Sequence, residues 1–261
     1  YLVTDNQIPD SLEELKYLAK KSNIDLKVID HKIIFEGFEQ FLPTFNSRSI
    51  ETLMYNIPHL SEHFVIFNDD VFILRKTSTS DFFTKNGNPV IRGKWKQFNE
   101  KRVLRKLYLN YIAKTKIKKK EKKDSNKEVM QNSAKHVGFN SKYFRRYHTP
   151  ISIRKSTAYN FLKEGDVLKE NIKHKFSDPN QFMISSLTEH LEIKSKTYSI
   201  KNTQLTYFRT YKNFIVVKMK LLWFDINKNK IFTTFQSLEM ADQKTQNYIL
   251  KWIDNKLNNP L

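Results

Sequence analysis

Short apolar runs and amphipathic stretches alternate along the first part of the chain. The apolar runs at residues 1–4 and 64–67 and the alternating stretch at 25–30 predict strands, and the stretches at 11–23 and 47–55 predict helices. Ser11 and Glu14 have the spacing of a capping box, in which Glu14 accepts a hydrogen bond from the Ser11 N–H. Strands and helices in this order favour an α/β fold with a largely parallel sheet.

The later pattern predicts two hairpins and two more helices. Asn86-Gly87 lies within residues 81–92 and favours a tight hairpin turn with positive φ at both positions. A second hairpin is predicted at residues 212–235, and helices are predicted at 97–116 and 242–257. The last helix is amphipathic, with an apolar face formed by Tyr248, Ile249, Trp252, Ile253 and Leu257.

Polar side chains follow the three predicted strands at their carboxyl ends. These side chains are Thr4-Asp5, Asp30-His31 and Asn68-Asp69-Asp70. Because ligands of parallel α/β sheets bind outside the carboxyl ends of the strands, we expect one crevice to collect all three groups. Two adjacent carboxylates can hold a divalent cation, or one can act as a general base. A turn or helix cap after the strand is the structural alternative.

The composition excludes several kinds of protein. There is no cysteine, which excludes disulfides and thiolate zinc sites. No apolar run approaches the roughly 20 residues that span a bilayer. Only five glycines are present, without a Walker loop, GxGxxG or GxSxG. The chain opens on YLVTDNQIP, which reads as a strand already under way, so we expect further residues to precede it in the natural protein.

The positive charge is concentrated in one part of the chain. The formal net charge is +19, and the segment from Arg92 to Tyr147 holds 19 Lys and Arg against 4 acids, a difference of +15. A local basic patch attracts a polyanion, an anionic membrane surface or nucleic acid. For residues 114–127 the alternative is a solvated, partly disordered insertion, because dense like charge opposes compaction.

A second cluster of functional side chains lies within SKYFRRYHTPISIRKS. His148 can take a proton from a sugar hydroxyl or give one to a leaving phosphate. The neighbouring cations can bind phosphate, and they are Arg145, Arg146, Arg154 and Lys155. The structural alternatives are a packed or surface histidine and a solvated basic face.

These segments together resemble the Stealth family. YLVTDNQIP, VIDH and FLPTFNSRSIETLMYNIPHLSEHFVIFNDDVF resemble the second conserved region of the family, and RRYHTPISIRKS resembles the third. The fourth region is matched only faintly, around residues 235–239. The family comprises bacterial capsular polysaccharide phosphotransferases and the eukaryotic N-acetylglucosamine-1-phosphotransferase.

The resemblance implies a sugar-phosphate transferase with a Rossmann-like, GT-A-like core. Such enzymes move a hexose- or hexosamine-1-phosphate from a UDP-sugar to a hydroxyl of a growing capsular polysaccharide and release UMP. Asp70 and His148 would be the central acid–base pair, and Asp69 would support them or a Mg²⁺ or Mn²⁺ ion. The implied substrate-binding residues are Asp5, Gln7, His31, Asn46, Ser47, Arg48, Asn68, Arg145, Arg154, Lys155 and Lys175.

The chain departs from the family pattern in two places. The first conserved region of the family, a strand with a tyrosine–threonine–tryptophan run, should precede Tyr1. The His-x-x-Arg element of the family reads His174-Lys175-Phe176-Ser177 here. Ser177 therefore stands where a phosphate-binding arginine is expected, and Lys173 or Lys175 would supply the charge.

We therefore expect a catalytic core at residues 1–91 and 141–239, a basic helical insertion at 92–140 and a C-terminal amphipathic helix at 240–261. The expected partners are a UDP-sugar, an anionic polysaccharide and an anionic membrane surface. The expected place is the bacterial cytoplasm, at the inner face of the inner membrane. A metal-dependent GT-A-type glycosyltransferase that releases UDP is the alternative function. Nucleic-acid binding, suggested by charge alone, would give Asn68-Asp69-Asp70 no role, and we expect no such partner.

Overall fold

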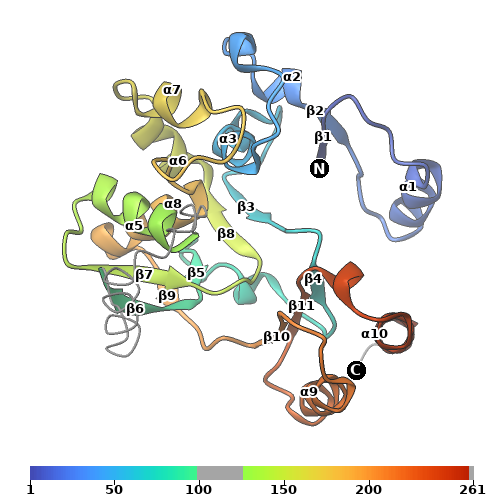
Figure 1. Cartoon of the computed structure of the whole chain (residues 1–261). Helices are drawn as coiled ribbons and strands as arrows, with labels where there is room; N and C mark the ends of the chain where they lie inside the picture. Colours follow the sequence, from blue (N-terminus) through green and yellow to red (C-terminus); the bar gives the residue numbers. More distant parts are fainter. Residues whose placement is uncertain (99–125, 259–261) are drawn as a thin grey trace, which may run out of the picture. The chain divides into compact units, whose positions relative to one another are not determined.

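The computed structural model describes residues 1–98 and 126–258, which form two compact units (Figure 1). The first unit comprises residues 1–62, 97–141 and 155–187, and the second comprises 63–96, 142–154 and 188–261. The chain therefore passes between the units several times, and each unit is assembled from distant parts of the sequence. The predicted helix at 97–116 lies almost wholly outside the described residues, as does most of the basic segment.

The first unit begins with a parallel strand–helix–strand arrangement. Strand β1 (Leu2–Thr4) pairs in parallel with β2 (Val28–Asp30), and helix α1 (Leu12–Lys21) connects them. This part confirms the pattern read from the sequence. The predicted capping box is wrong, because Ser11 makes no side-chain cap hydrogen bond. Its φ of −85° and ψ of 9° are far from the extended conformation that a capping side chain needs.

Short helices complete the first unit. They are α2 (His31–Ile34), α3 (Ser47–Thr52), α5 (Asn126–Val137), α6 (Lys155–Leu162) and α7 (Val167–Ile172), with 3₁₀ turns η1 (Glu39–Phe41) and η2 (Met54–Asn56). The predicted helix at 47–55 is thus an α-helix followed by a 3₁₀ turn. Ile34, Phe35 and Leu53 are fully buried and anchor these elements.

Short strands of several small sheets make up much of the second unit. Strand β3 (His63–Ile66) pairs antiparallel with β8 (Ile151–Arg154), and β5 (Val90–Ile91) pairs in parallel with β9 (Ser199–Ile200). Strand β6 (Gly93–Gln97) pairs with β7 (Lys142–Arg146). Helix α8 (Ile184–Ser195) begins in the first unit and ends in the second, and η3 (Thr79–Asp81) is a 3₁₀ turn.

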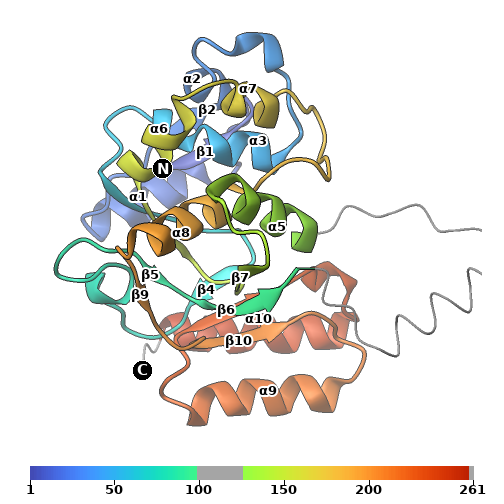
Figure 2. The same cartoon turned by 90° about the vertical axis from the view of Figure 1, so that its left-hand side faces the viewer.

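A three-stranded sheet carries the C-terminal part of the second unit. Its strand order is β10 (Leu205–Phe208), β11 (Phe232–Phe235), β4 (Val71–Ile73), with β10–β11 parallel and β11–β4 antiparallel. Helix α9 (Phe214–Ile226) connects β10 to β11, and α10 (Gln243–Asn258) follows the 3₁₀ turn η4 (Leu238–Met240). Figure 2 shows both helices beside this sheet. Their shared core includes Phe208, Phe224, Phe235, Ile249 and Ile253.

The predicted hairpin at residues 212–235 is wrong. Its first half is helix α9, and its second half, β11, pairs with β10 and β4. The run Ile215-Val216-Val217 is β-branched, and such residues are common in strands. The Asn213 side chain instead accepts hydrogen bonds from Ile215 N and Val216 N and starts a helix.

The earlier hairpin turn is present in a different form. Gly87 N donates to Thr84 O at 2.9 Å, and Gly87 has a φ of 76°. Asn86 is not among the residues with positive φ, so the prediction of positive φ at both positions is wrong. Glycine is suited to this position because it tolerates positive φ without steric cost.

The mixed α/β class is confirmed, but a single Rossmann-like sheet is not. Within residues 1–98 and 126–258, the strands form sheets of two or three members. Strand β3 pairs with β8 and belongs to the second unit, whereas β1 and β2 belong to the first. The predicted domain boundaries at residues 92, 141 and 240 stay predictions. No helix in the described part of the chain is long and apolar enough to cross a membrane.

Candidate active site

Asp70 and His148, far apart in the sequence, meet in the second unit. Asp70 lies directly before β4, and His148 lies in the loop between β7 and β8. His148 Nε2 is 2.8 Å from Asp70 Oδ1 and 3.1 Å from Oδ2. The side chains are 36% and 21% exposed, so a substrate can reach the pair. In a neutral imidazole whose Nε2–H donates to the carboxylate, Nδ1 is the nitrogen that can take a proton.

Strand β11 holds the main chain of Asp70 and of His148. Thr234 Oγ1 donates to the His148 carbonyl at 2.9 Å. Phe235 N donates to the Asp70 carbonyl at 3.0 Å. Two consecutive residues of one strand thus hold the two halves of the pair, and the antiparallel pairing of β11 with β4 extends this frame.

Tyr207 lies near His148, and the charge of Asp70 acts on both Tyr207 and Tyr211. The Tyr207 ring lies 6.0 Å from the His148 ring, and the Tyr207 hydroxyl bonds to Gln236 Oε1. Burial raises the pKa of Tyr207 and, together with the charge of Asp70, raises the pKa of Tyr211 to about 12. Both hydroxyls are therefore protonated near neutral pH, and the Tyr211 hydroxyl donates to Gln236 O.

Two exposed arginines bring positive charge close to Tyr207. Arg209 and Arg145 each lower the pKa of Tyr207, against the effects of burial and of Asp70. Both side chains are exposed. A guanidinium at such a position can form a bidentate contact with a phosphate group. Arg145 was predicted from the sequence, whereas Arg209 was not.

The two remaining residues of the Asn68-Asp69-Asp70 run have different surroundings. Asn68 O accepts a hydrogen bond from Val71 N at 3.2 Å, so the run forms the tight connection between β3 and β4. Asp69 is exposed. Among residues 1–98 and 126–258 there is no group of three His, Cys, Asp or Glu side chains arranged to hold a metal ion. Asp69 and Asp70 alone do not make such a site.

Arg154 pairs with Glu192, and its predicted role in substrate binding stays a prediction. Its Nε and a terminal nitrogen bind the two carboxylate oxygens of Glu192, at 2.9 and 2.5 Å. The terminal nitrogen also donates to Thr197 Oγ1. Glu192 is 2% exposed, so this fork is a structural ion pair within the second unit. Lys155 belongs to the first unit, where its N–H donates to Glu62 O.

The predicted side chains at the ends of β1 and β2 lie in the first unit. Asp5 Oδ1 is 3.8 Å from His31 Nδ1, just beyond the last paired residues Thr4 and Asp30. Asp30 caps α2 through Lys32 N and also accepts from Asn6 N. Gln7 is exposed. Because Asp70 belongs to the other unit, the expectation of a single crevice for all three strand ends is not confirmed.

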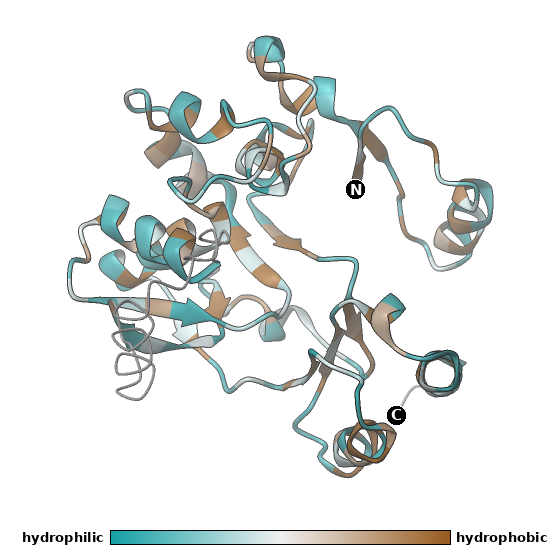
Figure 3. Cartoon of the chain, in the orientation of Figure 1, coloured by the Kyte–Doolittle hydropathy of each residue, from teal (hydrophilic) through white to brown (hydrophobic). Residues whose placement is uncertain are grey.

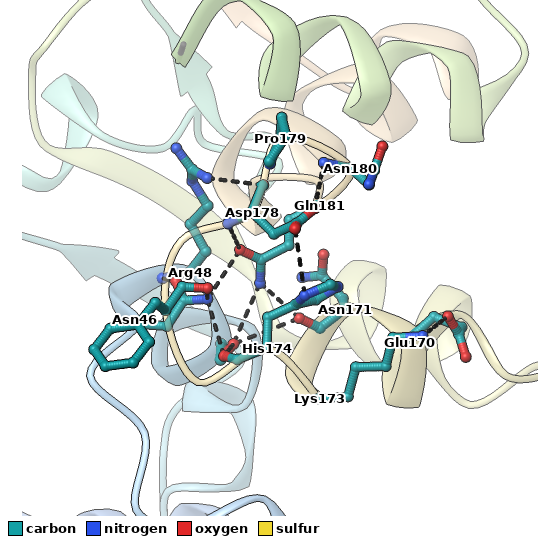
Figure 4. A network of polar contacts seen from close by, with 12 residues as sticks. Asn46, Arg48, Glu170, Asn171, Lys173, His174, Asp178, Pro179, Asn180 and Gln181 are labelled. Carbon is teal, nitrogen blue, oxygen red and sulfur yellow. Dashed lines mark hydrogen bonds and ion pairs between the residues drawn. The ribbon is translucent and has the colours of Figure 1, made fainter. Parts of the chain in front are cut away.

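Asn46 and Arg48 organise a loop with their side chains (Figure 4), and their role as ligands of the substrate stays a prediction. The Asn46 side-chain amide donates to His174 O, Phe176 O and Gln181 Oε1. Arg48 donates to Asp178 O at 3.1 Å. Both side chains are buried, which leaves exposed Ser47, at the first position of α3, as the member of this trio that solvent reaches.

The loop at residues 173–181 carries the altered His-x-x-Arg element. His174 O accepts hydrogen bonds from the Asn46 and Ser49 side chains, and His174 Nδ1 is 3.8 Å from Asp178 Oδ2. Lys175 Nζ lies 5.6 Å from the centre of the Phe45 ring. The predicted cation at this subsite is therefore next to an exposed aromatic ring, and Ser177 brings no positive charge.

Sequence reasoning missed Tyr207, Arg209, Thr234 and Gln236. The aromatic and β-branched residues of Leu205–Phe208 and Phe232–Phe235 were the available signal for two strands. The pairing of β10 with β11, and of β11 with β4, could not be predicted from either run. That pairing puts β11 beside β4, which directly follows Asp70.

Comparison with known proteins identifies the N-terminal third of the chain. Residues 1–91 match the model of Stealth protein CR2, conserved region 2. An exopolysaccharide phosphotransferase of Lactiplantibacillus plantarum is 51% identical over 89 residues, which are 34% of this chain and 24% of that protein. A capsular polysaccharide phosphotransferase of Haemophilus influenzae is 44% identical over 87 residues, 33% of this chain and 21% of that protein.

A further capsular polysaccharide phosphotransferase, of Neisseria meningitidis, is also 44% identical over 87 residues, 33% of this chain and 22% of that protein. The aligned part thus spans less than a quarter of each of these three relatives. The match to the family model includes Asp69 and Asp70 and ends before His148. The resemblance expected from the sequence is confirmed over residues 1–91, which match conserved region 2 of the Stealth proteins.

Proposed function

We propose that the protein is a phosphotransferase of capsule or exopolysaccharide synthesis. It would transfer a hexose- or hexosamine-1-phosphate from a UDP-sugar to a hydroxyl of an anionic polysaccharide, with release of UMP. The observation that carries the proposal is the Asp70–His148 pair, with 2.8 Å between Oδ1 and Nε2. The names of the relatives support the phosphotransferase class and the polysaccharide acceptor.

In this proposal His148 is the general base. Its Nδ1 takes the proton of the acceptor hydroxyl as the hydroxyl oxygen attacks the phosphorus that bears the sugar. The new P–O bond forms as the bond to the bridging oxygen breaks, and the electron pair leaves with UMP. Asp70, bonded to Nε2, orients the imidazole and stabilises its protonated form. Arg145 and Arg209 offset the negative charge of the phosphates.

A divalent cation would serve in this reaction only to bind the diphosphate of the donor. Asp69 is the exposed carboxylate that would contact a Mg²⁺ or Mn²⁺ ion, and phosphate oxygens and water would complete its shell. None of the proton-transfer steps above depends on this ion. We further place the protein in the bacterial cytoplasm, at the inner face of the inner membrane.

The by-product of the reaction tests the proposal. The protein is incubated with a panel of UDP-sugars and a capsule oligosaccharide, and nucleotides are separated by chromatography. UMP is the expected product, whereas UDP would show that the protein is a glycosyltransferase. Asp70→Asn and His148→Ala should each reduce the rate about 100- to 10,000-fold, the usual contribution of general acid–base catalysis.

Exposed Asp10, in the first unit, provides the matched control. Asp10→Asn removes a carboxylate without touching the pair and should leave the rate unchanged. Circular dichroism and thermal unfolding of each variant verify the fold. Near-normal turnover of folded Asp70→Asn or His148→Ala would refute the role given to that residue.

A further inference from the structure

Helix α9 exposes an apolar face. Six of its side chains are between 47% and 67% exposed, and they are Ile215, Val216, Met219, Leu222, Trp223 and Ile226. Their spacing of three or four residues puts them on one side of the helix, which we call the outer face of α9. Figure 3 shows the apolar character of this helix.

The outer face is not the face that α9 uses for folding. Val217, Leu221 and Phe224 point the other way and are buried in the core shared with the sheet and α10. A helix packed on a domain surface normally presents polar side chains on its opposite face. A contiguous exposed apolar patch instead marks a site of interaction with a protein or a membrane.

Lysines flank the outer face on both sides. Lys218 and Lys220 lie on opposite borders of the stripe by helical geometry, and exposed Lys212 and Lys228 lie beyond the two ends of the helix. Lys220 Nζ donates to Tyr207 O, and Lys218 Nζ lies over the Phe214 and Tyr248 rings. An ammonium group has three donors and keeps its charge in such contacts.

The acidic residue of α9 does not offset these cations. Asp225 is bound by Trp252 Nε1 at 3.1 Å and by Lys256 Nζ at 2.8 Å, on the side of the helix that faces α10. The outer face therefore combines an apolar centre, a tryptophan and a positively charged border. This combination is typical of helices that lie in the plane of a membrane interface.

We propose that the outer face of α9 inserts into the interfacial layer of an anionic lipid membrane. Side chains such as Met219 and Leu222 would enter the acyl boundary, Trp223 would lie at the headgroup level, and the lysines would extend to lipid phosphates. A second copy of the chain fits less well, because face-to-face packing would bring lysines of equal charge together.

The terminal helix α10 is a weaker candidate for a membrane contact. Of its predicted apolar face, Ile249 is 0% exposed and Ile253 is 4% exposed. Both belong to the internal core, so that face is not available. The proposed contact of α9 does not depend on catalysis by Asp70 and His148, and its test requires no substrate.

The experiment measures insertion of Trp223. The chain is mixed with vesicles of phosphatidylcholine, or of equal parts phosphatidylcholine and phosphatidylglycerol, prepared with and without brominated acyl chains. Brominated anionic vesicles should quench tryptophan fluorescence, and neutral ones should not. Trp223→Phe should lose the quenchable component while it keeps the apolar face, which separates Trp223 from Trp95 and Trp252.

A pair of charged substitutions supplies the second arm. Met219→Glu with Leu222→Glu should lower vesicle affinity at least about tenfold, because two apolar side chains no longer enter the lipid. Met240→Glu is the matched control, since Met240 is 80% exposed in the same unit and lies outside α9. It should bind vesicles like the parent chain. Circular dichroism verifies that each variant is folded.

Three results would overturn the proposal. One is the absence of quenching by brominated anionic vesicles. Another is equal vesicle affinity of Met219→Glu/Leu222→Glu and Met240→Glu, which would place lipid binding on another part of the chain. The third is a concentration-dependent dimer, seen by light scattering and removed by Met219→Glu/Leu222→Glu, without vesicle binding. That result would assign the outer face to a second copy.

Discussion

Two consecutive residues of β11 determine where the candidate acid–base pair lies. Thr234 reaches the His148 carbonyl through its side chain, and Phe235 reaches the Asp70 carbonyl through its main chain. Both hydrogen bonds go to main-chain carbonyls and leave the imidazole and the carboxylate free of them. Thr234 is therefore a positioning residue, and its hydroxyl can be removed without removing either reacting group.

Thr234→Val should lower kcat about tenfold and leave KM unchanged. The side chain is 0% exposed and nearly isosteric with valine, so the substitution mainly removes one hydrogen bond, worth about 1 kcal/mol in stability. The loop of His148 would then relax, and small displacements of a reacting group are costly in rate. The measurement is steady-state kinetics of UMP release by the folded variant.

Thr234→Ser is the control, because serine keeps the hydroxyl and loses only the methyl group. It should keep kcat close to that of the parent protein. A purely structural role would instead lower the thermal midpoint of both variants and leave kcat per folded molecule unaltered. Unchanged kcat in Thr234→Val would contradict the positioning role.

The sequence can name candidate site residues, but it cannot show which partners their side chains have in the fold. Asp70 and His148 could be named because their side-chain chemistry and their resemblance to a family agreed. Asn46, Arg48 and Arg154 are also polar. The first two bind a loop, and the third binds Glu192. Whether a polar side chain binds a ligand or another part of the protein depends on tertiary contacts that spacing does not encode.

Helix α9 shows how one side chain at a boundary decides the conformation of an element. Apolar and β-branched residues dominate Phe214–Ile226, so strand and helix both suit the run. Asn213 resolves the ambiguity, because its φ of −129° and ψ of 108° are extended and its carboxamide oxygen bonds to two helix N–H groups. The resulting strand–helix–strand unit allows β10 and β11 to be parallel.

Asn213→Ala should lower the free energy of unfolding by about 1 kcal/mol. The exposed Asn213 side chain packs against little else, so the loss comes from two unsatisfied N–H groups at the helix start. Urea unfolding followed by circular dichroism measures the change. Asn213→Asp keeps an accepting oxygen and should retain the parent stability. Equal stability of the alanine and aspartate variants would show that the cap does not start the helix.

The arrangement of the whole chain was the part least accessible from the sequence. Each unit combines segments more than 30 residues apart, such as residues 1–62 with 155–187 in the first. Local patterns predicted β1, α1 and β2 because these elements are adjacent in sequence and in space. They could not predict that β3 pairs with β8, since the antiparallel register of His63 with Arg154 depends on contacts across the intervening chain.

The pH dependence of stability should contain a contribution from Glu189. This side chain is fully buried in the second unit, with Oε1 3.5 Å from Arg146 Nε, and Oε2 has no hydrogen-bond partner among the described residues. Burial raises the pKa of Glu189 from 4.5 to about 7, against the charge of Arg146. Since the folded-state pKa exceeds the unfolded value, the folded state binds more protons between these two values.

The stability contributed by protonated Glu189 is therefore complete below about pH 4.5 and is lost as the pH rises through about 7. Glu189→Gln keeps the shape and cannot ionise, so the free energy of unfolding of the parent should fall relative to this variant between about pH 5 and about pH 8. Urea unfolding of both proteins across this range measures the difference, and all other titrating groups cancel in it. A difference that stays constant with pH would mean that Glu189 keeps one protonation state throughout, with Arg146 holding the carboxylate ionised despite its burial.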